Sequence, residues 1–318
     1  MERHNIAIVG LGWSGSGALI DLFEKAGNVD RYPYELDFWR KPGGLWACKN
    51  EPEFRKVAIR EICITVKVMI KNLIKCLIYP SYIKGQLRAI ASSAKLAFSL
   101  FIALTQSINP FNNQPGLKTF LMIFRRLFGS KNSVFVYDQP LFVEQISDES
   151  LSLLEAPACI FVVRDVFDQV QDLINNAQLL NVSSIRESFF IGAMGDLELG
   201  SESQQLRLML NTLRSRVTNL KRLINQYPTM LLVVRFEDLI LNTQQSITGV
   251  NSFLHSRGLP QAVISEEAAE NIFLKSVKNI GIGSVLKNQK SPLIQEMYAL
   301  QEDVEALLGL AATPANAI

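Results

Sequence analysis

The chain has 318 residues, of which 48% are hydrophobic and 19% are charged, a composition that excludes a disordered protein and allows a large core. Its four cysteines are scattered without a Cys-x-x-Cys pair and it has two histidines, so neither a disulfide framework nor a metal site is expected. The net charge of +2 is uneven: residues 51–131 carry +10, from 13 Lys and Arg against 3 Asp and Glu, which leaves −8 for the remainder.

The first predicted element is a strand, a tight turn and a helix start in residues 6–17, "IAIVGLGWSGSG", with the helical pattern "ALIDLFEKAG" after it. A turn of small residues before a helix typically binds a phosphate, because the helix-start N–H groups and the helix dipole favour an anion. Gly10, Gly12 and Gly15 fit G-x-G-x-x-G, which indicates a dinucleotide. The same turn is close to a nucleoside-triphosphate loop, but Ser16 stands where that motif has Lys.

Residues 51–131 are predicted to form a basic helical insertion with two long helices before the loop "NPFNNQPG". The first helix carries basic residues along one side and apolar residues along another, a pattern typical of helices that lie on anionic membranes, and also of a solvated helical cap. The basic side comprises Arg60, Lys67, Lys71 and Lys75, and the apolar side Ile59, Ile62, Val66, Met69 and Leu73.

The second of these helices includes "AIASSAKLAFSLFIALTQSI", twenty residues with one charge. Its length is sufficient to span a bilayer. Its Ser and Thr content and the central Lys95 favour instead a buried or interfacial helix.

Four apolar runs without alternation, "IAIVG", "VFVY", "CIFVV" and "MLLVV", are typical of parallel strands buried on both faces. Helical patterns separate them, and the longest, about residues 201–227, has one apolar stripe and ends before Pro228. The stripe comprises Leu206, Met209, Leu210, Leu213, Val217, Leu220 and Ile224. These features predict an α/β protein with a parallel sheet flanked by helices.

Charged residues follow two of these strands, at the sheet edge where such folds bind ligands. Arg164 and Asp165 follow "CIFVV", and a guanidinium there suits phosphate recognition. Residues 235–238, "RFED", follow "MLLVV". For Glu237 and Asp238 we favour a structural role, because an acidic pair stabilises a helix start.

Three segments, in this order, resemble the motifs of PAPS-dependent sulfotransferases. "WSGSGAL" is similar to K-[ST]-G-T-T-x-x-L, "VVRDVFDQVQD" to R-D-P-x-D-x-x-x-S, and "VRFEDLILNT" to [RY]-Y-E-D-L. Order and spacing agree over about residues 5–45 and 133–256, whereas the insertion has no counterpart. The chain thus resembles a divergent member of the family, close to its bacterial carbohydrate sulfotransferases. The resemblance implies one P-loop-like α/β domain over residues 1–318, with the insertion 51–131 inside it.

The resemblance also implies a binding site for the co-substrate PAPS, and no metal. The loop around the 5′-phosphosulfate would consist of Gly12, Trp13, Ser14, Gly15, Ser16, Gly17 and Ala18. Arg164 would bind the 3′-phosphate, Phe236 replaces an aromatic that packs on adenine, and Lys278 in "SVKNIGIGSVLKN" would be a further basic contact. Asp172 occupies the position of a Ser that contacts the 3′-phosphate, where a carboxylate would repel that phosphate.

The catalytic residues follow from "YELDFWR", which resembles a K-E-x-x-F-F segment in which the Glu is the general base. This makes Glu35 the candidate base, with a surface carboxylate as the alternative. Trp13 replaces the loop Lys or Arg that stabilises the transferring group, a loss of roughly 3–4 kcal/mol unless another cation supplies the charge. Arg40 and Lys41 are the candidate substitutes.

The function expected from this resemblance is transfer of a sulfuryl group from PAPS to a hydroxyl of a cell-surface sugar or lipid-linked glycan. One alternative is a non-catalytic, membrane-associated nucleotide-binding relative, which Trp13 and Asp172 favour. Another is a Rossmann-type NAD(P)- or FAD-dependent oxidoreductase, in which Asp30 or Glu35 would bind a ribose.

The expected partners are a sugar or glycolipid acceptor and an anionic membrane surface contacted by residues 51–131, and no nucleic acid is expected. The first strand begins by about residue 5, which leaves no room for a signal peptide. The expected location is therefore the cytoplasm, with peripheral attachment to the inner face of the membrane.

Overall fold

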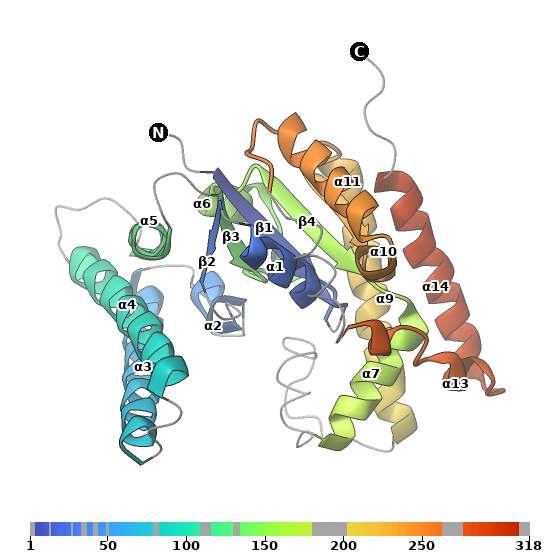
Figure 1. Ribbon diagram of the computed structural model, residues 1–318, viewed down its shortest axis with the longest axis horizontal. Helices are drawn as coiled ribbons and strands as arrows, with labels where there is room; N and C mark the ends of the chain where they lie inside the picture. Colours follow the sequence, from blue (N-terminus) through green and yellow to red (C-terminus); the bar gives the residue numbers. More distant parts are fainter. Residues whose placement is uncertain are drawn as a thin grey trace.

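The protein is built on a five-stranded parallel sheet in the strand order β2-β3-β1-β4-β5 (Figure 1). The computed structural model describes residues 4–12, 14–26, 28–32, 37–40, 44–48, 51–78, 83–108, 116–129, 134–179, 202–262 and 276–311. The strands are β1 (His4–Gly10), β2 (Val29–Arg31), β3 (Val134–Asp138), β4 (Ala158–Val163) and β5 (Leu231–Arg235). All four apolar runs form strands, and the predicted parallel α/β fold is confirmed.

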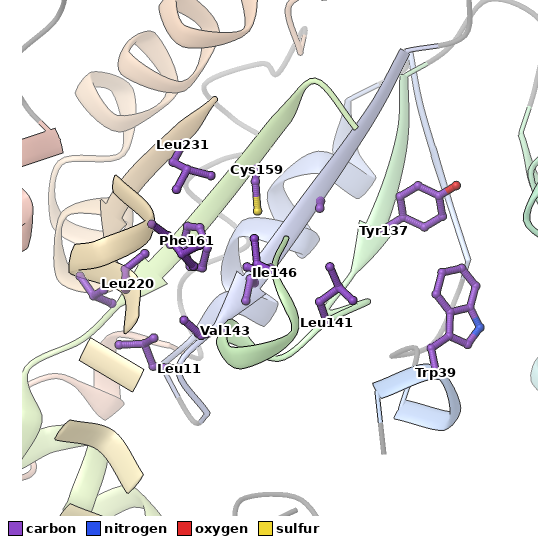
Figure 2. Packing of buried hydrophobic residues seen from close by; sticks show 14 of the residues in the cluster. Leu11, Trp39, Tyr137, Leu141, Val143, Ile146, Cys159, Phe161, Leu220 and Leu231 are labelled. Carbon is purple, nitrogen blue, oxygen red and sulfur yellow. The ribbon is translucent and has the colours of Figure 1, made fainter. Parts of the chain in front are cut away.

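Both faces of the sheet are buried, which explains why the strands do not alternate between apolar and polar residues. In β1, Ala7 and Val9 belong to one hydrophobic cluster while Ile6 and Ile8 belong to the other. Figure 2 shows part of the first cluster, in which Phe161 of β4 lies near Leu220 of the helix that covers this face.

Helices form a layer on each face of the sheet (Figure 1). The face of Ile6 and Ile8 is covered by α1 (Ser16–Lys25), α10 (Phe236–Leu241) and α11 (Thr243–Ser256). The opposite face is covered mainly by α6 (Asp148–Leu154), α7 (Val166–Leu179), α9 (Glu202–Gln226) and α14 (Pro292–Ala311). The short elements are α2 (Asp37–Arg40), η1 (Leu45–Ala47), η3 (Val143–Gln145), η4 (Val277–Asn279) and α13 (Ser284–Lys287).

Three helices lie between β2 and β3, in the region predicted as an insertion: α3 (Glu51–Ile78), α4 (Ile83–Ile108) and α5 (Gly116–Phe128). The first two match the two long helices expected from the sequence, and they pack against each other at one end of the molecule (Figure 1). Helix α5 belongs to the core: Phe120, Leu121 and Phe124 are fully buried, and the Phe124 ring lies 5.2 Å from that of Trp39. The region therefore combines a core helix with a peripheral hairpin.

Candidate functional site

The turn between β1 and α1 has a backbone that requires glycine. Gly15, which caps the N-terminus of α1, has φ +81°, and a Cβ atom there would lie 2.1 Å from Cδ2 of Phe236. A Cβ atom on Gly10 would lie 2.8 Å from the Oγ atoms of both Ser14 and Ser16. The turn thus packs its own serine hydroxyls against the end of β1 and places the first-turn N–H groups of α1 at the carboxyl edge of the sheet.

A cavity of about 360 Å³ opens at this edge of the sheet. It is the position at which parallel α/β folds bind ligands. The residues that line it are Gly10, Gly12, Gly15, Ser16, Gly17, Ala18, Arg40, Gln139, Phe142, Arg164, Asp172, Arg216, Phe236, Ser276 and Asn279. The turn after β1 and the guanidinium after β4 therefore face one cavity.

Arg164 is 2% exposed and has several partners within the protein. One Nη donates to Oδ2 of Asp172 at 2.6 Å, and the other donates to the carbonyl of Asn279 at 2.6 Å. The guanidinium also lies 4.9 Å from the centre of the Phe236 ring, a cation–π distance. Arg164, the predicted phosphate contact, thus forms an ion pair with Asp172 in the cavity wall. Asp172 is the residue whose carboxylate was expected to repel that phosphate.

Phe236 lies between the turn and Arg164. Its ring fills the space beside Gly15 and is 3% exposed. Phe236 is the first residue of α10, directly after β5, and it lines the cavity.

Two further buried arginines line the cavity, Arg40 and Arg216, which are 5% and 3% exposed. Their guanidinium carbons lie 5.0 and 5.3 Å from the centre of the same ring, Phe142. Arg40 donates to Oε1 of Gln139 at 2.6 Å. This wall of the cavity therefore carries two buried guanidinium groups.

Arg216 also contacts the turn itself, since it donates to the carbonyl of Leu11 at 2.7 Å and forms a 3.4 Å ion pair with Glu144. Burial lowers the pKa of Arg216, Glu144 opposes that shift, and the charge of Arg40 adds to it. The two guanidinium groups therefore repel each other, and an anion between them would relieve the repulsion.

Sequence reasoning missed Arg216, Gln139 and Phe142. A signal exists for Arg216, because it lies between Leu213 and Leu220 on the apolar stripe of α9. A charged residue on a buried helix face requires a partner, and this one reaches across the fold to the turn after β1. Gln139 follows β3 with φ +47°, and no motif in the sequence indicates its role.

The segment 276–283, which includes the predicted contact Lys278, forms one wall of the cavity and packs against α7. Ser276 and Asn279 line the cavity, whereas Lys278 is exposed and is not among the lining residues. Asp168, which is 3% exposed, fixes this segment by accepting hydrogen bonds from the backbone N–H groups of Gly281 and Gly283, both at 2.7 Å. This segment is therefore held at a buried carboxylate of α7.

Asp165 and Glu237 have structural contacts. Asp165 accepts the backbone N–H groups of Phe167 and Asp168 at the start of α7, and its own N–H donates to Glu237 at 3.1 Å. Burial raises the pKa of Glu237. These contacts agree with the structural role that we favoured for Glu237 at a helix start.

Three of the predicted site residues, Trp13, Glu35 and Lys41, lie outside the described residues, so their roles stay predictions. Within the described part of the chain, no three His, Cys, Asp or Glu side chains are grouped to hold a metal ion.

No protein-family model matches this sequence, and no curated protein matches it significantly. The solved structures that are similar to it include three sulfotransferases or sulfotransferase domains. The sulfotransferase domain of the olefin synthase from Synechococcus PCC 7002 has a TM-score of 0.51 at 13% identity, with 96% of this chain and 94% of that chain covered. The sulfotransferase domain from the curacin biosynthetic pathway has a TM-score of 0.48 at 13% identity, with 96% and 98% covered. A sulfotransferase from Alicyclobacillus acidocaldarius has a TM-score of 0.40 at 10% identity, with 93% and 100% covered.

At identities of 13% or less, these comparisons concern the fold, and the first one, with its TM-score above 0.5, is the one that supports an assignment. It covers nearly all of both chains. The resemblance that the three sequence motifs indicated is thus confirmed for the fold: this chain has a sulfotransferase-like fold.

Proposed function

We propose that this protein transfers a sulfuryl group from PAPS to a hydroxyl group of a cell-surface sugar or lipid-linked glycan. The observation that carries the proposal is that the turn after β1 and Arg164 line one cavity, although 147 or more residues separate them in the chain. PAPS carries an anionic group at each end of its ribose, and this cavity offers helix-start N–H groups at one place and a buried guanidinium at another.

In this proposal, the N–H groups around Ser16 and Gly17 bind the 5′-phosphosulfate, and Arg164 binds the 3′-phosphate. Phe236 presents an apolar surface beside both. At Gly17, in the first turn of α1, there is space for a phosphate, because no atom lies within 4 Å of the point where a Cβ would stand.

The reaction is an in-line displacement at sulfur. The acceptor oxygen forms a bond to sulfur while the bond from sulfur to the bridging oxygen of the 5′-phosphate breaks, and adenosine 3′,5′-bisphosphate leaves. Glu35 is proposed to take the proton of the acceptor hydroxyl. The glycan acceptor is proposed because the segment around Glu35 resembles that of carbohydrate sulfotransferases.

Arg40 and Arg216 are proposed to replace the cation that the loop lacks at Trp13. Both guanidinium groups are buried, both line the cavity, and both flank the Phe142 ring. A fixed positive charge at the site stabilises the negative charge that develops on the transferring group. Lys41, adjacent in sequence, remains a candidate for the same role.

Arg40→Gln tests this part of the proposal. Sulfuryl transfer from radiolabelled PAPS to a panel of sugar and glycolipid acceptors should fall by roughly 10²-fold. Binding of adenosine 3′,5′-bisphosphate, which lacks the sulfuryl group, should change little. Arg207→Gln, an exposed arginine of α9 outside the cavity lining, is the matched control. A transfer rate that Arg40→Gln leaves unchanged would remove Arg40 from this role.

The ion pair between Arg164 and Asp172 supports a second candidate, a non-catalytic nucleotide-binding relative. Asp172 neutralises part of the charge that a 3′-phosphate requires. Tight binding of adenosine 3′,5′-bisphosphate without transfer to any acceptor would favour this candidate.

A further inference from the structure

The hairpin of α3 and α4 has an outer surface that the fold does not use. Of the 14 large hydrophobic side chains exposed in the described part of the chain, ten lie on these two helices. On α4 the exposed positions recur at spacings of four and three: Leu87, Ala91, Ala94, Phe98 and Phe101. Three of these, Leu87, Phe98 and Phe101, are 53–54% exposed.

Helix α3 repeats the same spacing with Ile59, Cys63, Val66, Ile70 and Leu73, all exposed. At helical geometry these positions share one side of the helix. Lys67, Lys71 and Lys75 are also exposed, at intervals of four, and each lies beside this apolar stripe. Helix α3 thus combines an exposed apolar stripe with a row of exposed cations.

The charge of the hairpin indicates what binds its outer surface. Residues 62–108 contain six Lys and Arg and no Asp or Glu. A second copy of this chain would bring six positive charges against six others, which is unfavourable. An anionic bilayer attracts the same charges while its hydrocarbon boundary accepts the apolar side chains.

The packing of α4 decides between lying on a membrane and crossing it. The segment Gln86–Ser107 has a mean hydropathy of 1.6 and is long enough to cross, but 33% of it is buried within the protein. Ser99 and Leu100 are fully buried, and Nζ of Lys95 donates to the carbonyl of Leu127 in the core helix α5 at 3.0 Å. Because one side of α4 packs on the protein core in this way, only its outer side can contact lipid.

We infer that the α3–α4 hairpin lies on anionic lipid bilayers, inserting Phe98, Phe101 and the α3 stripe between headgroups while Lys67, Lys71 and Lys75 contact the phosphates. The inference concerns the surface alone and is independent of the proposed sulfuryl transfer. If both hold, the cavity works next to the leaflet that contains a glycolipid acceptor.

The test is flotation of the full chain with vesicles. The protein should float with vesicles of phosphatidylglycerol and phosphatidylcholine, and not with phosphatidylcholine alone. Lys67→Gln, Lys71→Gln and Lys75→Gln together should weaken binding by about 100-fold, from roughly fivefold for each charge. The matched control, Lys221→Gln with Arg222→Gln and Lys290→Gln, removes three exposed charges elsewhere and should leave binding unchanged.

A second variant, Phe98→Ser with Phe101→Ser, keeps every charge and should also abolish flotation. Both replaced residues are exposed, so the thermal midpoint should stay that of the unaltered chain. Failure to float with anionic vesicles would overturn the inference, as would equal losses in the charge variant and its control. Resistance of bound protein to extraction at high salt and alkaline pH would show a spanning helix and overturn it as well. A lipid-free dimer that Phe98→Ser and Phe101→Ser dissociate, without flotation, would assign the surface to a second copy.

Discussion

Arg164 has buried contacts within the fold and is also the proposed contact for the 3′-phosphate. A buried guanidinium requires partners, and Asp172, Asn279 and Phe236 supply them. These contacts fix its direction before a ligand arrives, which favours binding. The Asp172 carboxylate, however, is also close to any phosphate that Arg164 would bind.

Asp172→Asn separates these effects. Removing the carboxylate should strengthen binding of adenosine 3′,5′-bisphosphate by roughly fivefold or more, because the repulsion between two anions is lost. It should also lower the thermal midpoint of the ligand-free protein, since Arg164 then lacks a charged partner. Isothermal calorimetry and thermal unfolding measure the two changes. Asp303→Asn, an exposed carboxylate of α14 outside the cavity lining, should change neither. Unchanged or weaker binding by Asp172→Asn would contradict the predicted repulsion, and weaker binding would show that the orientation of Arg164 by Asp172 matters more.

At the scale of single residues, a strand end or a turn in the sequence indicated some of the residues that line the cavity, such as Gly15, Arg164 and Phe236. The chain places these next to recognisable strands, so their location follows from the sheet. Arg216 could not be placed in this way, because its contact with Leu11 joins residues 205 positions apart. Its role depends on how α9 crosses the sheet, which no local pattern specifies.

Helix α5 shows how one element of the basic region differs from its neighbours. Phe124 is fully buried and its ring packs against Tyr32, Trp39, Phe128 and Phe135. Phe124→Ala should therefore reduce the free energy of unfolding by about 3–5 kcal/mol, as measured by urea denaturation. Phe98→Ala, the same substitution at an exposed position of α4, should cost less than about 1 kcal/mol. Similar losses for the two variants would contradict the division into core helix and peripheral hairpin.

A second contact ties α5 to α6. Arg125 is buried and forms an ion pair with Glu155, the residue that ends α6. The hydrogen bond from Arg125 holds the pKa of Glu155 below its usual value of 4.5. Since the folded pKa is depressed, the stabilisation is present above pH 4.5 and is lost as the pH falls through the folded value.

Glu155→Gln should accordingly reduce the free energy of unfolding at neutral pH by about 1 kcal/mol, a small value because more than half of this side chain is exposed and water screens the pair. The difference from the unaltered chain should disappear in strong acid. Urea denaturation at several pH values measures this, with Glu149→Gln on the exposed side of α6 as the control. A loss that does not change with pH would show that the pair contributes through packing.

Helices and strands were predictable where their apolar residues form a continuous run or a regular stripe. The strands β1, β3, β4 and β5 are continuous apolar runs, and α9 has a long apolar stripe, so both types of element were predicted from residue pattern alone. The edge strand β2 has only three residues and no apolar run, and it is defined by pairing with β3. The amphipathic patterns of α3 and α4 predicted helices, but not which side packs, because exposed and buried sides are both apolar.

On the scale of the whole molecule, the cavity is assembled from almost the full length of the chain. Its lining begins at Gly10 and ends at Asn279, and it includes residues from both sides of the α3–α5 region. The order of the strands brings these parts to one edge, with β1 at the centre of the sheet. A single ligand that contacts both the turn and Arg164 would thus join the two halves of the fold.

Calorimetric titration with adenosine 3′,5′-bisphosphate tests this claim most directly. The unaltered chain should bind it, and Arg164→Gln should bind it at least about tenfold more weakly, because a charge-assisted contact to the 3′-phosphate is lost. Arg235→Gln, at the end of the neighbouring strand and outside the cavity lining, should bind normally. Adenosine 5′-monophosphate, which lacks the 3′-phosphate, should bind equally to all three proteins. Equal affinity of the bisphosphate for the unaltered chain and Arg164→Gln, or binding of NAD in its place, would contradict the proposed donor site.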